Sequence, residues 1–198
     1  MLKGWHGLFG TFTGVALITV AVLPVAALVV GVLARRRRAA GVPTALARRW
    51  SLAEVGIVYG TVPWVWMILL PGSHPGADPR VSLVPLRDLF AILSGSPVTA
   101  TAQIVGNLLV FAALGFFCPQ RFPALASVPR ALALGAGCSA LVETAQYVLR
   151  LDRVSSVDDV LVNAAGAGLA ALASRRWWRA AAGASEEDRP LSAPAPGR

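Results

Sequence analysis

Charged residues are scarce in this sequence, and acidic residues are scarcer than basic ones. Only 14% of the 198 residues are Asp, Glu, Lys or Arg, whereas 56% are hydrophobic. A soluble domain usually has about 25% charged residues. The composition therefore excludes an ordinary soluble domain and indicates an integral membrane protein.

Cysteine and histidine are almost absent, which excludes several kinds of site. Cys118 and Cys138 lack the paired spacing of a zinc site or of a secreted disulfide framework, so we expect both to be unpaired. His6 and His74 are far apart and have no ligand-like neighbours. The sequence thus predicts no metal site and no cofactor, and it offers no Ser, Cys or His constellation for acyl transfer.

Lysine is nearly missing too, although the formal net charge is +8. The basic residues are mostly arginines that lie beside apolar runs, where such residues set membrane topology. They do not cover one face of a soluble domain, so we do not expect nucleic-acid binding.

Long apolar runs are what the sequence has in abundance. A helix needs about 20 apolar residues to cross the hydrocarbon core. Stretches of this kind lie at about 8–34, 53–70, 98–117, 131–149 and 157–173. The first run continues into "RRRR", which favours an uncleaved anchor over a signal peptide. We predict an all-α fold, a polytopic membrane helical bundle with about five transmembrane helices.

The arginines predict the orientation of this bundle in the cell membrane. They follow the first run at Arg35–Arg38, Arg48 and Arg49, and the fifth run at Arg175, Arg176 and Arg179. Both regions should therefore be cytoplasmic. Five crossings then place the N-terminus on the extracytoplasmic side and the C-terminus in the cytoplasm.

The chain divides into three predicted regions. Residues 1–52 form an N-terminal transmembrane anchor with a basic cytoplasmic loop, 53–178 form the main transmembrane domain, and 179–198 form a disordered cytoplasmic tail. Residues 71–97 form the one long extracytoplasmic loop. Its part 81–93, "VSLVPLRDLFAIL", fits either a segment that lies at or re-enters the membrane interface, or a simple connector.

Polar residues gather in the predicted outer halves of the third, fourth and fifth runs. Helical spacing puts each set on one face: Gln103 and Asn107; Glu143, Gln146, Tyr147 and Arg150; Asp159, Asn163 and Gly166. Because ionisable groups inside a membrane are costly, these faces should turn inward, toward one another.

We therefore predict an outward-facing polar pocket. Its expected ligand-binding residues are Asn107, Glu143, Gln146, Arg153, Asp158, Asp159, Asn163 and Arg87. Arg153 and Asp158, with Arg87 or Arg150, should form a rim that neutralises the carboxylates. Structural alternatives stay open: Asp158 and Asp159 also fit an acidic helix start with Ser155 or Ser156 as cap, and Glu143 also fits a buried ion pair.

These residues resemble the VanZ-like membrane proteins. The resemblance rests on "ETAQ" at 143–146, on Arg153 and on "SVDDVLVNAAG" at 156–166; "NLLVFAALGF" at 107–116 and "SLVPLRDL" at 82–89 add weaker matches. It covers about residues 55–173, so the main domain is expected to be VanZ-like. Ser82 and Ser156 depart from the family pattern, in which asparagine and aspartate are expected. Membership implies an association, in one founding member, with tolerance of glycopeptide antibiotics such as teicoplanin.

Two functional hypotheses follow. In the first, a non-catalytic envelope protein recognises a cell-wall precursor, a lipid head group or an amphipathic antibiotic, with membrane lipids around it. In the second, an intramembrane enzyme acts on an envelope lipid or precursor, with Glu143 as general acid or base and Asp159 or Asp158 as its partner. A transporter is disfavoured because the inner halves offer no polar path. The sequence predicts neither the oligomeric state nor whether a reaction is catalysed.

Overall fold

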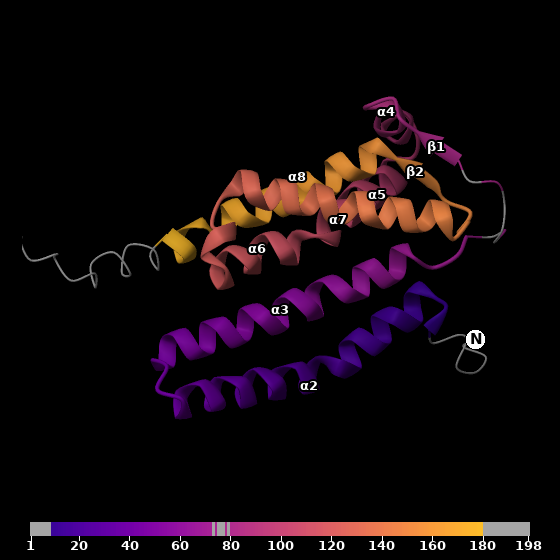
Figure 1. The fold of residues 1–198 in the computed structure, drawn as a ribbon. Coiled ribbons are helices and arrows are strands. Elements are labelled where there is room, and N and C mark those ends of the chain that lie inside the picture. Colours follow the sequence, from indigo (N-terminus) through magenta and orange to yellow (C-terminus); the bar gives the residue numbers. More distant parts are fainter. Residues whose placement is uncertain (1–8, 73, 75–77, 79, 180–198) are drawn as a thin grey trace, which may run out of the picture.

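The computed structural model describes residues 9–72, 74, 78 and 80–179. Long helices run side by side, and two three-residue strands lie at one end of them (Figure 1). This arrangement confirms the all-α membrane bundle predicted from the sequence. Of the predicted tail 179–198, residues 180–198 lie outside the described residues.

Helices α2 (Phe12–Ala39) and α3 (Thr44–Ile68) form a hairpin. The turn between them is short, and Gly41 adopts a φ of 86°, a conformation that glycine reaches without a steric penalty. Arg35–Arg38 belong to the end of α2, and Arg48 and Arg49 to the start of α3, so the basic segment expected as a loop after the first run consists largely of the ends of these two helices. Arginine is a good helix former, which lets both helices continue beyond their apolar runs.

The third predicted span is divided in two. Helix α5 (Pro97–Val110) and helix α6 (Ala112–Arg121) meet at Phe111, whose φ of −115° and ψ of 14° interrupt the helix. Both helices pack against α8 (Val157–Ala173), which also contacts α7 (Val128–Val148). At Gly166 a Cβ atom would come within 1.9 Å of the Leu108 carbonyl oxygen, so glycine permits the close approach of α8 to α5.

The long loop before α5 contains two elements. Strand β1 (Arg80–Ser82) pairs in parallel with β2 (Val154–Ser156), with Arg80 opposite Val154. The seven-residue helix α4 (Arg87–Leu93) follows β1, and a short 3-10 helix, η1 (Pro123–Leu125), joins α6 to α7. The sequence did not predict this strand pair, because each strand has only three residues.

Three helical stretches in the described part of the chain are long and apolar enough to cross a membrane: Phe12–Ala39, Thr44–Ile68 and Pro97–Arg121. Helices α7 and α8, with 21 and 17 residues, lie alongside them (Figure 1). The membrane bundle is thus established, whereas five crossings and their direction stay predictions.

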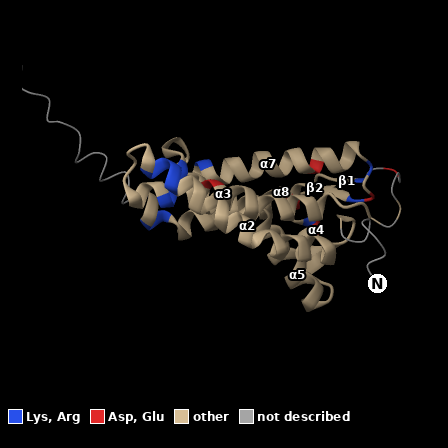
Figure 2. Ribbon diagram, turned by 90° about the horizontal axis from the view of Figure 1, so that it is seen from below, with Lys and Arg blue, Asp and Glu red and all other residues tan. Residues whose placement is uncertain are grey.

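Charge is distributed unevenly along the bundle. Most Lys and Arg residues gather at one end, and most Asp and Glu residues lie toward the end that holds β1, β2 and α4 (Figure 2). The α2–α3 turn lies at the end opposite to the strands (Figure 1). The basic end is the one predicted to face the cytoplasm.

Candidate functional site: a polar chamber beside the strand pair

A cavity of about 310 Å³ lies where the end of α3 meets α5, α7, α8 and the segment around β2. We call it the polar chamber. Most of the predicted binding residues line it: Asn107, Glu143, Gln146, Arg153, Asp159 and Asn163. Ile68, Arg80, Asp152 and Val154 complete its wall. The helical stripes read from the sequence therefore converge only in part, because Gln103 lies outside this lining and both Tyr147 and Arg150 are exposed.

Glu143 reaches the polar chamber from the last turns of α7. One carboxylate oxygen, Oε2, accepts a hydrogen bond of 3.1 Å from the Ser156 backbone N–H. The Glu143 backbone carbonyl accepts a hydrogen bond of 3.0 Å from the Ser155 hydroxyl. Within the described residues, Glu143 forms no ion pair. Its carboxylate thus keeps further capacity to accept hydrogen bonds.

Asp159 faces Asn107 across the close contact between α8 and α5. The Asn107 side-chain amide donates to Asp159 Oδ1 at 2.5 Å. Like Glu143, Asp159 lacks an ion-pair partner in the part of the chain that the structure describes. Two carboxylates therefore share one chamber without direct neutralisation.

Gln146 and Arg153 donate hydrogen bonds to backbone carbonyls at and just after the end of α3. The Gln146 amide donates to the Ile68 carbonyl at 2.7 Å, and the Arg153 guanidinium donates to the Leu70 carbonyl through Nε at 3.3 Å and Nη2 at 3.2 Å. The last carbonyls of a helix lack partners within the helix, so they attract such donors. The expected neutralisation of Glu143 and Asp159 by rim arginines is accordingly not formed among the described residues.

Asn163 carries an unusual buried atom. Its side chain is 3% exposed, and its amide nitrogen donates to the Ser139 hydroxyl at 2.8 Å. Its oxygen Oδ1 is buried and has no hydrogen-bond partner within the described residues. Buried polar atoms nearly always have a partner, which can be water or a ligand. Asn163 therefore offers an acceptor at the chamber wall.

Asp158 points away from the polar chamber. Its carboxylate, in a side chain that is 4% exposed, accepts hydrogen bonds from the backbone N–H groups of Leu86, Asp88 and Leu89. These groups start α4 and lack partners within that helix. Asp158 thus serves as a distant cap that holds α4 in place. Arg87, the remaining predicted ligand residue, is exposed on α4 and is not part of the chamber lining.

Ser156 joins this arrangement from the start of α8. Its hydroxyl accepts from the Asp158 N–H, which confirms the predicted serine cap, and donates to Asp88 Oδ2 at 2.6 Å. Hydrogen bonds from the Ser156 and Ser82 hydroxyls hold the pKa of Asp88 below its ordinary value, and Arg87 adds to this effect. The ionised form of Asp88 therefore favours the docked position of α4.

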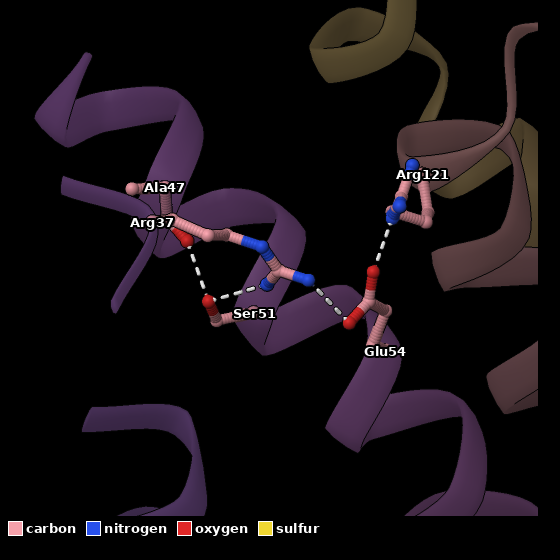
Figure 3. A network of polar contacts seen from close by, with 5 residues as sticks. All are labelled: Arg37, Ala47, Ser51, Glu54 and Arg121. Atoms are coloured by element: carbon pink, nitrogen blue, oxygen red, sulfur yellow. Dashed lines mark hydrogen bonds and ion pairs between the residues drawn. The ribbon is translucent and has the colours of Figure 1, made fainter. Parts of the chain in front are cut away.

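A second polar cluster was missed by the sequence reasoning. Glu54 accepts from Arg121 and, at 2.5 Å, from Arg37, while Arg37 also donates to the Ser51 hydroxyl at 2.6 Å (Figure 3). The Ser51 hydroxyl in turn donates to the Ala47 carbonyl at 2.7 Å. We call this group the Glu54 cluster; it links α2, α3 and α6. A single acidic residue beside an arginine-rich segment was the available signal.

The order of these motifs matches a known family. The family model described as VanZ/LLP1 matches residues 57–178, which is more than half of the chain. This chain belongs to the VanZ/LLP1 family. The resemblance seen in the sequence is thus confirmed. No curated protein and no solved structure matches the chain.

The VanZ/LLP1 match includes the whole polar chamber but not all of the bundle. Helix α2 and Glu54 lie before residue 57, so the Glu54 cluster joins residues outside the matched region to Arg121 within it. Within the described residues, no group of three or more His, Cys, Asp or Glu is placed to hold a metal ion, and Cys118 and Cys138 are both free.

Proposed function

We propose that this VanZ/LLP1 protein is an envelope protein whose polar chamber binds the polar head of an amphipathic molecule. The observation that carries this proposal is the pair of chamber carboxylates, Glu143 and Asp159, that form no ion pair within the described residues. A carboxylate inside a membrane is costly unless it is paired. A ligand with hydrogen-bond donors supplies that pairing.

The chamber lining specifies the chemistry of this head. Glu143 and Asp159 accept hydrogen bonds when ionised, so they suit ammonium or hydroxyl groups. Arg80 and Arg153 line the same chamber and suit a phosphate or a carboxylate. A head that carries both donors and an anion complements the site. Lipid head groups, cell-wall precursors and glycopeptide antibiotics are the classes that we consider.

We also propose that the chamber opens to the extracytoplasmic side, because the arginine-rich end lies opposite to it. Single cysteines at Asp78 and at Ala40 test this orientation. A membrane-impermeant maleimide added to intact cells should label Asp78→Cys and not Ala40→Cys. The reverse pattern would place the chamber at the cytoplasmic face.

The binding test uses lipid and precursor mass spectrometry on the full-length protein. Wild type purified in a mild detergent should retain a polar-headed molecule, and Glu143→Gln should retain about tenfold less of it, a difference of about 1.4 kcal/mol. Glutamine preserves the volume of the side chain but not its charge. Thr144→Ala is the matched control, since Thr144 is the exposed next residue and, among the described residues, its hydroxyl bonds only Ala140 of its own helix. An unchanged profile in Glu143→Gln would refute the binding role.

The second candidate function is an intramembrane enzyme. It is favoured by Glu143 and Asp159 lining one cavity, where one can act as general acid and the other as general base. The two candidates separate when the retained molecule is incubated with purified protein. A change in its mass with wild type, but not with Glu143→Gln, supports catalysis, whereas retention without any change supports binding alone.

Family membership also suggests tolerance of teicoplanin as an expectation for this chain. Expression in a susceptible bacterium should raise the minimum inhibitory concentration of teicoplanin if the chamber acts on the antibiotic or its target. The Glu143→Gln protein, at equal abundance in the membrane, should lose that increase. Equal tolerance with both proteins would exclude the chamber from this phenotype.

A further inference from the structure

A second cavity adjoins the polar chamber. It has a volume of about 330 Å³ and lies between α4, α5 and α8. Most of its lining surface is apolar and comes from residues such as Leu89, Ile92, Ile104 and Val162, although half of its twelve lining residues are polar, among them Asp88, Gln103 and Ser156. We call it the apolar chamber.

The two chambers share part of their walls. Asn107, Asp159 and Val154 line both of them. The hydrogen bond between Asn107 and Asp159 therefore lies at the boundary, with polar groups on one side and aliphatic side chains on the other. A single molecule with a polar and an apolar part would meet matching surroundings on each side of this bond.

Three acidic residues line the apolar chamber; Asp159 is shared with the polar chamber, and the other two, Asp88 and Asp158, already have protein partners. Asp158 accepts three backbone hydrogen bonds from the start of α4, and Asp88 accepts from the Ser156 hydroxyl. Because these two carboxylates already accept hydrogen bonds from the protein, they do not need donors from a bound molecule. Contact with the aliphatic side chains is what the chamber mainly offers.

The helix that covers the apolar chamber exposes large apolar side chains. Helix α4, which supplies Leu89 and Ile92 to the lining, exposes Phe90 and Leu93 on its other side. A short helix with exposed large apolar side chains suits the membrane interface. An apolar chain inside the chamber would thus be separated from the surrounding lipid only by α4.

We infer that the ligand is a lipid, whose head occupies the polar chamber and whose chain occupies the apolar chamber. This inference rests on the proposed function and narrows it: a soluble head without a chain fills only half of the site. The Asn107–Asp159 hydrogen bond marks the junction between head and chain. Asn163, whose buried Oδ1 has no hydrogen-bond partner in the described residues, lines the polar chamber on the head side.

The test uses a probe of defined chemistry. Full-length protein is placed in phosphatidylcholine nanodiscs with a small fraction of phosphatidylethanolamine that carries a photoreactive group on one acyl chain. This probe has an ammonium and a phosphate in its head, which match the carboxylates and arginines of the polar chamber. Illumination should link the chain to residues of α4 or to the part of α5 around Ile104.

A blocking variant and its neighbour refine the result. Ile104→Trp fills the apolar chamber, whereas Val105→Trp adds the same ring at a position that is 46% exposed. We expect cross-linking at α4 and α5 to fall about tenfold in Ile104→Trp, which corresponds to about 1.4 kcal/mol, and to stay unchanged in Val105→Trp. Unlabelled phosphatidylethanolamine should compete with the probe, and glycerophosphoethanolamine, which has no chain, should not.

The outcomes separate this inference from the proposed function. Cross-linking that falls in Glu143→Gln but not in Ile104→Trp overturns the lipid inference and leaves head binding intact. Cross-linking that falls in neither variant overturns both. Equal competition by the chain-free head also overturns the lipid inference. If Ile104→Trp does not fold, the position of the adduct in wild type decides: an adduct confined to the outer surfaces of α2 and α3 overturns it.

Discussion

The carboxylate of Glu54 and the carboxylates of Glu143 and Asp159 occupy opposite surroundings in one bundle. Glu54 is held by Arg37 and Arg121, so each of its oxygens accepts from a guanidinium (Figure 3). Glu143 accepts from a backbone N–H and Asp159 from an amide, and in the described part of the chain neither meets a cation at ion-pair distance. The first arrangement joins helices, whereas the second leaves room for a ligand.

This difference shows why the presence of a carboxylate in a membrane helix does not by itself identify a site. The arginines near Glu54 satisfy it within the protein, as expected for a structural group. The arginine near Glu143 and Asp159, Arg153, is engaged by the Leu70 carbonyl instead. The hydrogen-bond and ion-pair partners of each acid distinguish a structural carboxylate from a candidate ligand-binding one better than its depth in the bundle does.

The largest effect is expected from Glu54→Ala. Removing the carboxylate leaves Arg37 and Arg121 without their shared acceptor, and hydrogen bonds to charged groups contribute about 1.5–3 kcal/mol. Because these side chains are partly exposed, we expect a loss of about 2 kcal/mol in the free energy of unfolding. Thermal unfolding of the solubilised protein measures it. Gln120→Ala is the control, since the Gln120 side chain bonds only Phe116 of its own helix in the part of the chain that the structure describes; equal melting of both variants would contradict a joining role for Glu54.

Unlike Glu54→Ala, Asp159→Asn should weaken ligand retention without lowering stability. Asparagine preserves the shape and an oxygen that can accept from Asn107, so the melting temperature should change little. Retention of the copurifying ligand should fall about tenfold, or about 1.4 kcal/mol, because the charge is lost. Mass spectrometry and thermal unfolding on the same samples measure both quantities. A destabilisation as large as that of Glu54→Ala, with ligand retention unchanged, would show that Asp159, like Glu54, has a structural role.

Substitutions of two buried serines, one beside the polar chamber and one in the Glu54 cluster, test the same comparison with smaller expected effects. Ser139→Ala removes the acceptor of the Asn163 amide, and Ser51→Ala removes an acceptor of Arg37. Each should lower the free energy of unfolding by about 1 kcal/mol, the usual net contribution of a hydrogen bond. Only Ser139→Ala should also weaken ligand retention, since Asn163 lines the polar chamber. An equal loss of ligand in both variants would indicate a general effect of stability.

The smallest effect concerns pH and α4. The pKa of Asp88 is lowered in the folded protein, so its contribution to stability is fully present above the unfolded value of about 3.9 and is lost as the pH falls through the lower folded value. Hydrogen exchange of α4 amides should therefore accelerate at acidic pH, relative to α7 amides. Asp88→Asn should reduce this acceleration. The neighbouring Asp158 carboxylate faces the same helix start, so Asp158→Asn serves as the companion variant.

Much of the polar chamber could be predicted from the sequence. The positions of Asn107, Glu143, Gln146, Asp159 and Asn163 followed from helical spacing and from the cost of turning polar groups toward lipid. The predicted fifth run, 157–173, coincides with α8. Such features depend on neighbours a few residues away, which a sequence displays directly.

The hydrogen-bond partners of the polar groups were harder to predict from the sequence. Arg153 was expected to neutralise a carboxylate, yet it bonds the carbonyl of Leu70, a buried residue just beyond the end of α3. Asp158 was expected at the ligand, yet it caps α4, which starts 71 residues earlier at Arg87. The Glu54 cluster was not foreseen, because Arg121 lies 67 residues from Glu54.

The sequence by itself determined that this chain is a membrane bundle of the VanZ/LLP1 family and which helical faces are polar, because composition and a period of 3.6 residues are local properties. Only the tertiary structure decided which acid is neutralised, which one caps a helix and which two have no ion-pair partner among the described residues. Those roles depend on which donors the packing of distant helices brings within hydrogen-bonding distance of each carboxylate.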